Sequence, residues 1–258
     1  AEVSANGARL AVFPETWVPG YPVWANADSR WNYEPAKKAY AELYRNSVDV
    51  PGRALWPLQQ AAREHGVAVV MGVNERCATG TLYNSMVFID SDGTLLGCHR
   101  KLVPTYHERM IWGRGDGSTL SVFDSSVGKL GGLVCWEHWM PLARYALYAE
   151  GEQVHAALWP SASETFLLAC RNVAVEGRVF VVPAASYLTK AMLPAGFPLT
   201  KELESFPETL CRGGSAIVGP DARFMAGPVY DCETVLYADV DLNRLIEEKQ
   251  LLDVAGHY

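Results

Sequence analysis

The chain has 258 residues, with 22 Lys and Arg against 29 Asp and Glu, and a formal net charge of −7. A length prior of roughly 150 residues per domain allows one large domain or two small ones. No basic surplus is present to neutralise phosphates, so nucleic acid is excluded as an expected partner. The composition, 49% hydrophobic and 20% charged, is that of a globular protein rather than a disordered one.

Neither a membrane anchor nor a disulfide framework is expected. The longest near-continuous apolar run, residues 67–73, is far shorter than the roughly 18 to 20 residues that span a bilayer. Residues 1–7 lack the pattern of a signal peptide. Six cysteines are spread along the chain without a CxxC pair, which predicts reduced thiols and a cytoplasmic location.

The first third of the chain predicts a short strand followed by helices. Residues 9–13 are apolar and stop at Pro14, which is typical of a strand, and the segment before them is the end of a helix closed by Gly7. Further predicted elements are helices over residues 35–48 and 54–65 and a buried strand over residues 67–73.

The rest of the chain alternates strands with helices. Hairpins are predicted at residues 83–99, around Ser91-Asp92-Gly93, and at residues 215–225. Between them lie predicted strands at 130–134, 156–159 and 179–184 and predicted helices at 141–149 and 165–176. This order favours an α/β sandwich of mixed sheets covered by helices, in one domain over residues 1–258. The Pro-rich stretch 191–208 is predicted to be a long surface loop of the kind that binds ligands.

Three apolar strands each run into a reactive side chain: Glu15, Lys101 and Cys135. The carboxyl ends of strands are where open α/β sheets place ligands. A thiol with a pKa near 8.5 needs a base or a nearby positive charge to act as a nucleophile, which Glu15 and Lys101 would supply. Taken singly, each residue is more often a cap, a surface charge or a core thiol, and spacing alone does not show that they meet.

Other constellations point to no metal or phosphate site. The six histidines show neither HxH nor HExxH spacing, so no zinc site is expected. The glycine-rich residues 113–117 match neither a P-loop nor a dinucleotide fingerprint and predict a turn. Cys135 and His138 are three residues apart, a spacing unsuited to a protease Cys–His pair.

Three longer motifs carry a family resemblance. They are FPETWVPGYP at residues 13–22, HRKLVPT at 99–105 followed by Glu108, and LVCWE at 133–137. In this order the chain resembles the nitrilase branch of the carbon-nitrogen hydrolase superfamily over nearly its whole length. The resemblance implies a four-layer αββα sandwich that pairs into a homodimer or larger homo-oligomer. It also implies a strand before Gly7, a late strand at 239–241 and a C-terminal tail, and the first and last of these are expected to be missing here.

The resemblance also implies roles for individual residues. Glu15 matches the general base, Lys101 the catalytic lysine, Cys135 the nucleophile and Glu108 a second, positioning glutamate. Positions expected to contact substrate are Tyr21, Trp112 and Trp136. Their aromatic character predicts an apolar or aryl nitrile as the small-molecule substrate, with no metal or organic cofactor.

The implied reaction converts a nitrile to a carboxylic acid and ammonia through a thioimidate and a thioester on Cys135. An amidase or carbamoylase of the same superfamily would use the same residues and is the first alternative. The Cys135-Trp136-Glu137 sequence resembles the nitrilase branch more closely. A non-catalytic binding protein on the same fold is the second alternative.

Overall fold

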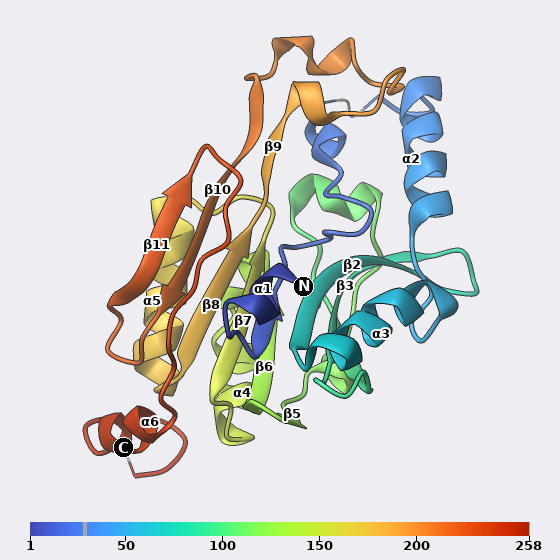
Figure 1. Ribbon diagram of the computed structural model, residues 1–258. Helices are drawn as coiled ribbons and strands as arrows, with labels where there is room; N and C mark the ends of the chain where they lie inside the picture. The colour runs from blue at the N-terminus through green and yellow to red at the C-terminus, as the bar shows by residue number, and fades with distance from the viewer. Residues whose placement is uncertain (28–29, 258) are drawn as a thin grey trace.

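The computed structural model describes residues 1–27 and 30–257, in which two β-sheets pack face to face (Figure 1). The first sheet has the strand order β1-β2-β3-β4. Its strands are β1 (Leu10–Val12), β2 (Ala68–Arg76), β3 (Leu82–Ile89) and β4 (Leu95–Arg100). Because β1 is parallel to β2 while the next two pairings are antiparallel, β1 and β4 end at the same edge of the sheet.

The second sheet has the order β11-β10-β8-β7-β6-β5, with β9 paired to β10. Its strands are β5 (Phe123–Ser125), β6 (Gly128–Val134), β7 (Val154–Trp159), β8 (Phe180–Ala185), β9 (Tyr187–Thr189), β10 (Thr209–Val218) and β11 (Phe224–Tyr230). The central strands β6, β7 and β8 are parallel, and helices connect them.

Helices cover the outer face of each sheet, which gives four layers in the order αββα (Figure 1). On the first sheet α3 packs Leu58 and Ala62 against Val69 and Met71 of β2. On the second sheet α4 packs Ala143 and Leu147 against Leu133 of β6. The helices are α1 (Glu2–Ala5), α2 (Glu34–Asn46), α3 (Trp56–His65), α4 (Pro141–Ala149), α5 (Glu164–Gly177) and α6 (Asn243–Lys249). Within the described residues, no helix combines the length and the apolar character that crossing a bilayer requires.

The core lies between the two sheets, and strand alternation decides which residues enter it. Val70, Met86 and Phe88 from the first sheet pack against residues of β6 and β7 in the second. Successive side chains of a strand point to opposite faces, so Asn84 shares the inner face of β3 with Met86 and Phe88. A polar side chain is therefore directed into the layer between the sheets.

The predicted sandwich is confirmed, and most predicted elements lie within a few residues of the observed ones. The prediction for residues 67–73 ended the strand too early, because β2 continues through the polar residues Asn74, Glu75 and Arg76, whose backbone stays paired with β3. The prediction of a strand at residues 239–241 is wrong, because this segment has no regular secondary structure. The family resemblance implies a strand here, but among the described residues this segment pairs with no strand.

The stretch 191–208 is a long, largely surface-lying loop, as predicted, and it is anchored at Leu199 and Leu203. It begins within one short 3₁₀ turn, Lys190–Met192, and contains another, Glu202–Ser205. Leu199 is fully buried in a cluster that also contains Trp24 and Trp112. The apolar residues of this segment are spaced too irregularly to predict a helix or a strand. They nevertheless anchor the segment to the core.

Candidate active site

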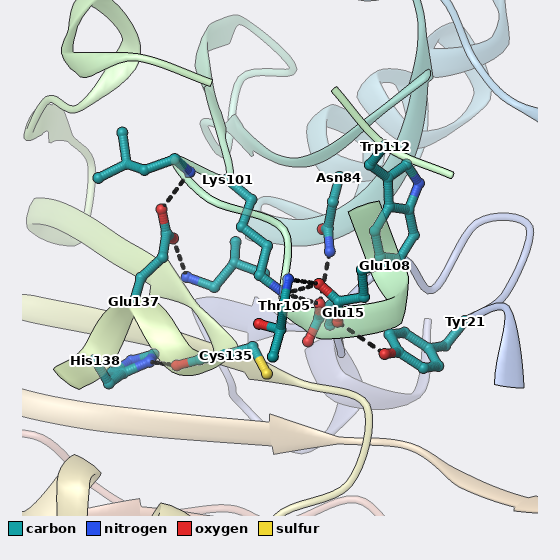
Figure 2. Close-up of polar contacts among 12 residues, drawn as sticks. Glu15, Tyr21, Asn84, Lys101, Thr105, Glu108, Trp112, Cys135, Glu137 and His138 are labelled. Atoms are coloured by element: carbon teal, nitrogen blue, oxygen red, sulfur yellow. Dashed lines mark hydrogen bonds and ion pairs between the residues drawn. The ribbon is translucent and has the colours of Figure 1, made fainter. Parts of the chain in front are cut away.

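The structure brings Glu15, Lys101 and Cys135 together at one edge of the sandwich (Figure 2). Glu15 follows β1 and Lys101 follows β4 in the first sheet, while Cys135 follows β6 in the second. One oxygen from each of Glu15 and Glu108 and the sulfur of Cys135 all lie within 4.8 Å of one another. The three side chains predicted to meet at the strand ends therefore lie close together in the folded protein.

Lys101 lies between two carboxylates. Its ammonium nitrogen is 2.9 Å from Oε1 of Glu15 and 2.7 Å from Oε2 of Glu108, and all three residues are buried. Burial by itself would lower the pKa of Lys101, but the two carboxylates and the neighbouring thiol hold it above its ordinary value. The side chain is therefore a permanent positive charge inside the protein.

The two carboxylates are held by different partners. Glu108 belongs to the 3₁₀ turn Tyr106–Met110, and its Oε2 also accepts the backbone N–H of Thr105 at 2.7 Å. For Glu15, Oε1 accepts from Nδ2 of Asn84 at 2.6 Å as well as from Lys101. Among the described residues, Oε2 of Glu15 has no hydrogen-bond partner although it is buried. This oxygen is the one available to accept a proton.

Burial also sets the proton affinity of Glu15. It raises the pKa of this carboxyl to about 7, against the lowering effect of Lys101. The position depends on Gly72 of β2, because a Cβ at residue 72 would lie 2.3 Å from the carbonyl oxygen of Pro14 and from the backbone nitrogen of Thr16. A glycine at this point lets the segment that carries Glu15 cross close to the strand.

Cys135 begins the 3₁₀ turn Cys135–Trp139 directly after β6, with a φ of +57°. Such left-handed backbone in a non-glycine residue costs of order 1–3 kcal/mol and is common at active sites. Burial raises the pKa of the Cys135 thiol, and the charge of Glu15 adds to this effect, while Lys101 opposes it. The thiol therefore rests in its protonated form and needs a base, and Glu15 lies beside it.

Glu137 ties this turn to the other sheet. Its Oε2 accepts the N–H of Val134 at 2.6 Å, and its Oε1 accepts the N–H of Leu102, just after Lys101, at 2.7 Å. His99 of β4 lies 3.1 Å from the same carboxylate. Glu137 thus joins the segment before the nucleophile to the segment after the lysine.

Two of the three predicted aromatic positions lie in the site. The hydroxyl of Tyr21 donates to Oε1 of Glu108 at 2.8 Å, and its ring lies 5.8 Å from that of Trp112. Trp112 is buried, and its Nε1 donates to Oδ1 of Asn74 at 2.7 Å. Trp136 is 44% exposed, and its ring makes an edge contact with Phe166 of α5.

Sequence reasoning missed Asn84 and the support that Glu137 gives. The signal for Asn84 was an amide alternating with Met86 and Phe88 on an otherwise apolar face of the strand. A buried polar group needs a partner, so such an amide indicates a polar site. Glu137 gave no comparable signal, because its partners from the other sheet, the N–H of Leu102 and the His99 ring, are more than 30 residues away along the chain.

One carboxylate oxygen of Glu15, one of Glu108 and the Cys135 sulfur have a spacing that could hold a metal ion. The Lys101 ammonium already bonds to both carboxylates and supplies the positive charge that a cation would bring. A separate cavity of about 750 Å³ lies between β1, β8 and β10, and none of Glu15, Lys101, Glu108 and Cys135 lines it.

The fold and site together define a class: an αββα sandwich with a thiol, a carboxylate and an ammonium at the edge where the sheets meet. The family model for carbon-nitrogen hydrolases matches residues 1–250. The chain belongs to the carbon-nitrogen hydrolase family.

Several relatives are similar over the whole chain. A nitrilase of Bradyrhizobium diazoefficiens is 40% identical over 100% of this chain and 80% of its own length. An aliphatic nitrilase of Rhodococcus rhodochrous is 38% identical and covered over 72% of its length. A bifunctional nitrilase/nitrile hydratase of Lupinus angustifolius is 38% identical and covered over 75%.

Solved structures share the fold at lower identity. A carbon-nitrogen hydrolase of Helicobacter pylori superposes with a TM-score of 0.72 at 20% identity, over 97% of this chain and 84% of that one. Nit3 of Saccharomyces cerevisiae gives a TM-score of 0.71 at 18% identity, over 96% and 82%.

The central charge of the site can be tested through stability. Lys101→Met would leave two buried carboxylates side by side, so we expect the free energy of unfolding to fall by about 3–5 kcal/mol at pH 8. At pH 5 the deficit should shrink, because Glu15, whose raised pKa rises further without the lysine, protonates instead of staying charged beside Glu108. Urea unfolding at both pH values measures this change.

Lys129→Met is the matched control, because Lys129 pairs with an exposed Asp124 and its loss should have little effect. A Lys101→Met deficit of equal size at pH 5 and pH 8 would contradict the charge argument.

Proposed function

We propose that this protein is a nitrilase that hydrolyses an organic nitrile to the carboxylic acid and ammonia, with Cys135 as nucleophile. The observation that carries the proposal is the Cys135 thiol beside the unpartnered oxygen of Glu15 and the buried Lys101 ammonium. Relatives named as nitrilases, 38–40% identical over the full chain, support the same activity.

The first stage forms a covalent bond to the substrate. Glu15 takes the proton of the Cys135 thiol, and the sulfur attacks the nitrile carbon. The nitrile nitrogen gains the electron pair and then the proton, which gives a thioimidate. Lys101 stabilises the negative charge that develops on this nitrogen, as a preorganised donor in a site shielded from water does.

The second stage consumes two waters. Glu15 activates the first water, which adds to the thioimidate carbon, and ammonia leaves to give a thioester. A second water attacks the thioester carbon and releases the carboxylic acid, and the proton returns to the Cys135 sulfur. The sequence of steps needs no metal or organic cofactor, because the Glu15 and Lys101 side chains supply the base and the positive charge.

Glu108 and Tyr21 act as positioning residues in this scheme. The Glu108 carboxylate holds the Lys101 ammonium at 2.7 Å, and the Tyr21 hydroxyl in turn holds Glu108. Fixing an ammonium within a fraction of an ångström is what makes it effective in a transition state. The rings of Tyr21 and Trp112 favour an apolar or aryl nitrile, with the partly exposed Trp136 further out.

Two alternatives remain. An amidase would use the same Glu15, Lys101 and Cys135, and the solved structures that share the fold include an amidase of Nesterenkonia, at 20% identity. The full-length relatives named as nitrilases favour the nitrile. A non-catalytic binding protein would not need a base, an ammonium and a thiol buried together at one point.

A nitrile panel tests the activity. Aliphatic, aryl and arylacetonitrile substrates should release ammonia and acid, and Cys135→Ala should lose this release by at least 10³-fold, since the covalent step disappears. Acid, amide and ammonia are measured together by chromatography, because some relatives are named as bifunctional nitrilase/nitrile hydratases.

Cys170→Ala is the matched control, because Cys170 is a buried thiol in the core away from Glu15. Hydrolysis of amides alone by the folded protein would establish the amidase. Silence on both substrate classes would favour the binding protein.

The pH profile tests the base. Glu15 must be ionised to accept the thiol proton, so kcat/KM should fall as the pH drops through about 7, the pKa of Glu15. Asn84→Leu removes a hydrogen bond that stabilises the ionised form, so the acid limb should move to higher pH by about one unit, as expected for loss of a charge-assisted bond.

Asn46→Leu, on the exposed end of α2, is the control and should leave the acid limb in place. An acid limb at the same pH in Asn84→Leu and in the unchanged protein would rule out this role for Asn84.

We also propose that the protein self-associates through a second copy of the chain. Large apolar side chains lie exposed on the turn after Cys135 and on α4 and α5, which pack against each other. They are Trp139, Leu142, Tyr145 and Leu168, called here the α4–α5 patch. Leu142 is 85% exposed in the single chain, an unusual state for a leucine beside other apolar groups.

Sedimentation velocity should give a mass of at least two chains. Leu142→Glu places a charge in the α4–α5 patch and should shift the protein toward the monomer, whereas Ile246→Glu on α6, also exposed, should not. A monomeric native protein at micromolar concentration would disprove the proposal.

The cytoplasmic location stays a proposal as well. All six cysteines are free thiols, one of them exposed and two partly exposed. A reducing compartment maintains such thiols.

A further inference from the structure

A buried polar chain lies behind the nucleophile, and the mechanism above does not use it. Nδ1 of His138 lies 2.6 Å from the backbone carbonyl oxygen of Cys135. Nε2 of the same ring lies 3.1 Å from Nε2 of His155, and Nδ1 of His155 lies 2.9 Å from the carboxylate of Glu152. All three side chains are at least 98% buried.

The contacts fix where the protons are. A carbonyl oxygen only accepts, so Nδ1 of His138 carries a proton and donates it. Burial, followed by the neighbouring His155, lowers the pKa of His138 well below its ordinary value, so its ring is neutral and its Nε2 is an acceptor. Nε2 of His155 must then donate to it. On the other side of the ring, Nδ1 of His155 hydrogen-bonds to the Glu152 carboxyl.

The hydrogen-bonded series His138–His155–Glu152 belongs to the second sheet and the turn after β6. His155 is on β7, in register with Gly131 of β6, and Glu152 lies two residues before the first residue of that strand. A Cβ at residue 131 would lie 2.1 Å from Oε1 of Glu152. The Glu152 carboxylate therefore occupies the space that a side chain at residue 131 would fill, so this position requires glycine.

Further contacts hold the His138 ring and its backbone. The ring stacks on Trp159 of β7, with centroids 4.9 Å apart and an interplanar angle of 24°. The guanidinium of Arg144 donates to the backbone carbonyl of His138 at 2.9 Å and pairs with Glu176. The positive charge of Arg144 close to His138 also lowers the pKa of the His138 imidazole.

We propose that His138 is a positioning residue for the Cys135 nucleophile, and that His155 and Glu152 act through it by fixing the tautomer that donates to the Cys135 carbonyl. The proposal rests on the proposed function, since it concerns the rate of the thiol reaction. Cys135 has left-handed backbone, which persists only where surrounding groups determine it. A hydrogen bond to its own carbonyl restrains that backbone directly.

Steady-state kinetics with the best substrate of the panel, nitrile or amide, tests the donor. His138→Leu removes it, and we expect kcat to fall by roughly ten- to a hundred-fold with little change in KM, as for a misplaced reacting group. His138→Asn keeps an N–H donor on the same side-chain carbon, so it should retain kcat to within about three-fold. Glu152→Gln keeps a hydrogen-bonding group beside Nδ1 of His155 and should behave like His138→Asn.

The exposed His65→Asn is the control and should match the unchanged protein. A His138→Leu variant with unchanged kcat would overturn the proposal, and so would His138→Asn as impaired as His138→Leu at equal thermal stability.

A second measurement needs neither activity nor a destabilised variant. Nitrogen-15 NMR of histidine-labelled protein should show His138 as the neutral Nδ1–H tautomer, unchanged from pH 7 to pH 5.5. The His107→Asn background is used, because Nδ1 of His107 also contacts a side chain, Asn26. Absence of a non-titrating Nδ1–H histidine would refute the buried hydrogen-bonded chain whether or not the protein hydrolyses nitriles.

Discussion

The Lys101 ammonium, held between the carboxylates of Glu15 and Glu108, is the interaction around which the site is organised. A buried charge is tolerated only when it is paired, and two like charges are tolerated side by side only when an opposite charge lies between them. Oε1 of Glu15 accepts hydrogen bonds from Lys101 and Asn84, whereas Oε2 has no partner among the described residues. The Lys101 ammonium thus both compensates buried negative charge and lowers the proton affinity of Glu15.

The nucleophile depends on a second set of buried polar contacts. Glu137 ties the residue before Cys135 to the segment after Lys101, and His138 holds the carbonyl of Cys135 itself. The Glu137 bonds cross from one sheet to the other, and the contact of His138 with His155 joins the turn after β6 to β7. Each buried polar group is costly unless satisfied, so the network specifies a single arrangement of the turn.

Much of the fold followed from local sequence. Alternating apolar residues and glycine turns predicted the hairpin β3–β4, and helical periodicity predicted α4 and α5. Local pattern failed where tertiary contacts decide. β2 extends through the polar residues Asn74 to Arg76, because β3 pairs with them. The strand that the family resemblance implies at residues 239–241 does not form.

The sequence by itself determined the layered α/β class, the reactive residues at three strand ends, and, through motifs around Glu15, Lys101 and Cys135, the family resemblance. Only the tertiary structure decided that these side chains lie within reach of one another, that Asn84 orients Glu15, and that Trp136 lies partly exposed against Phe166. Side-chain identity and periodicity are local properties of a chain. Distance, burial and the pKa of about 7 at Glu15 depend on groups from both sheets, and these meet only when the sheets pack.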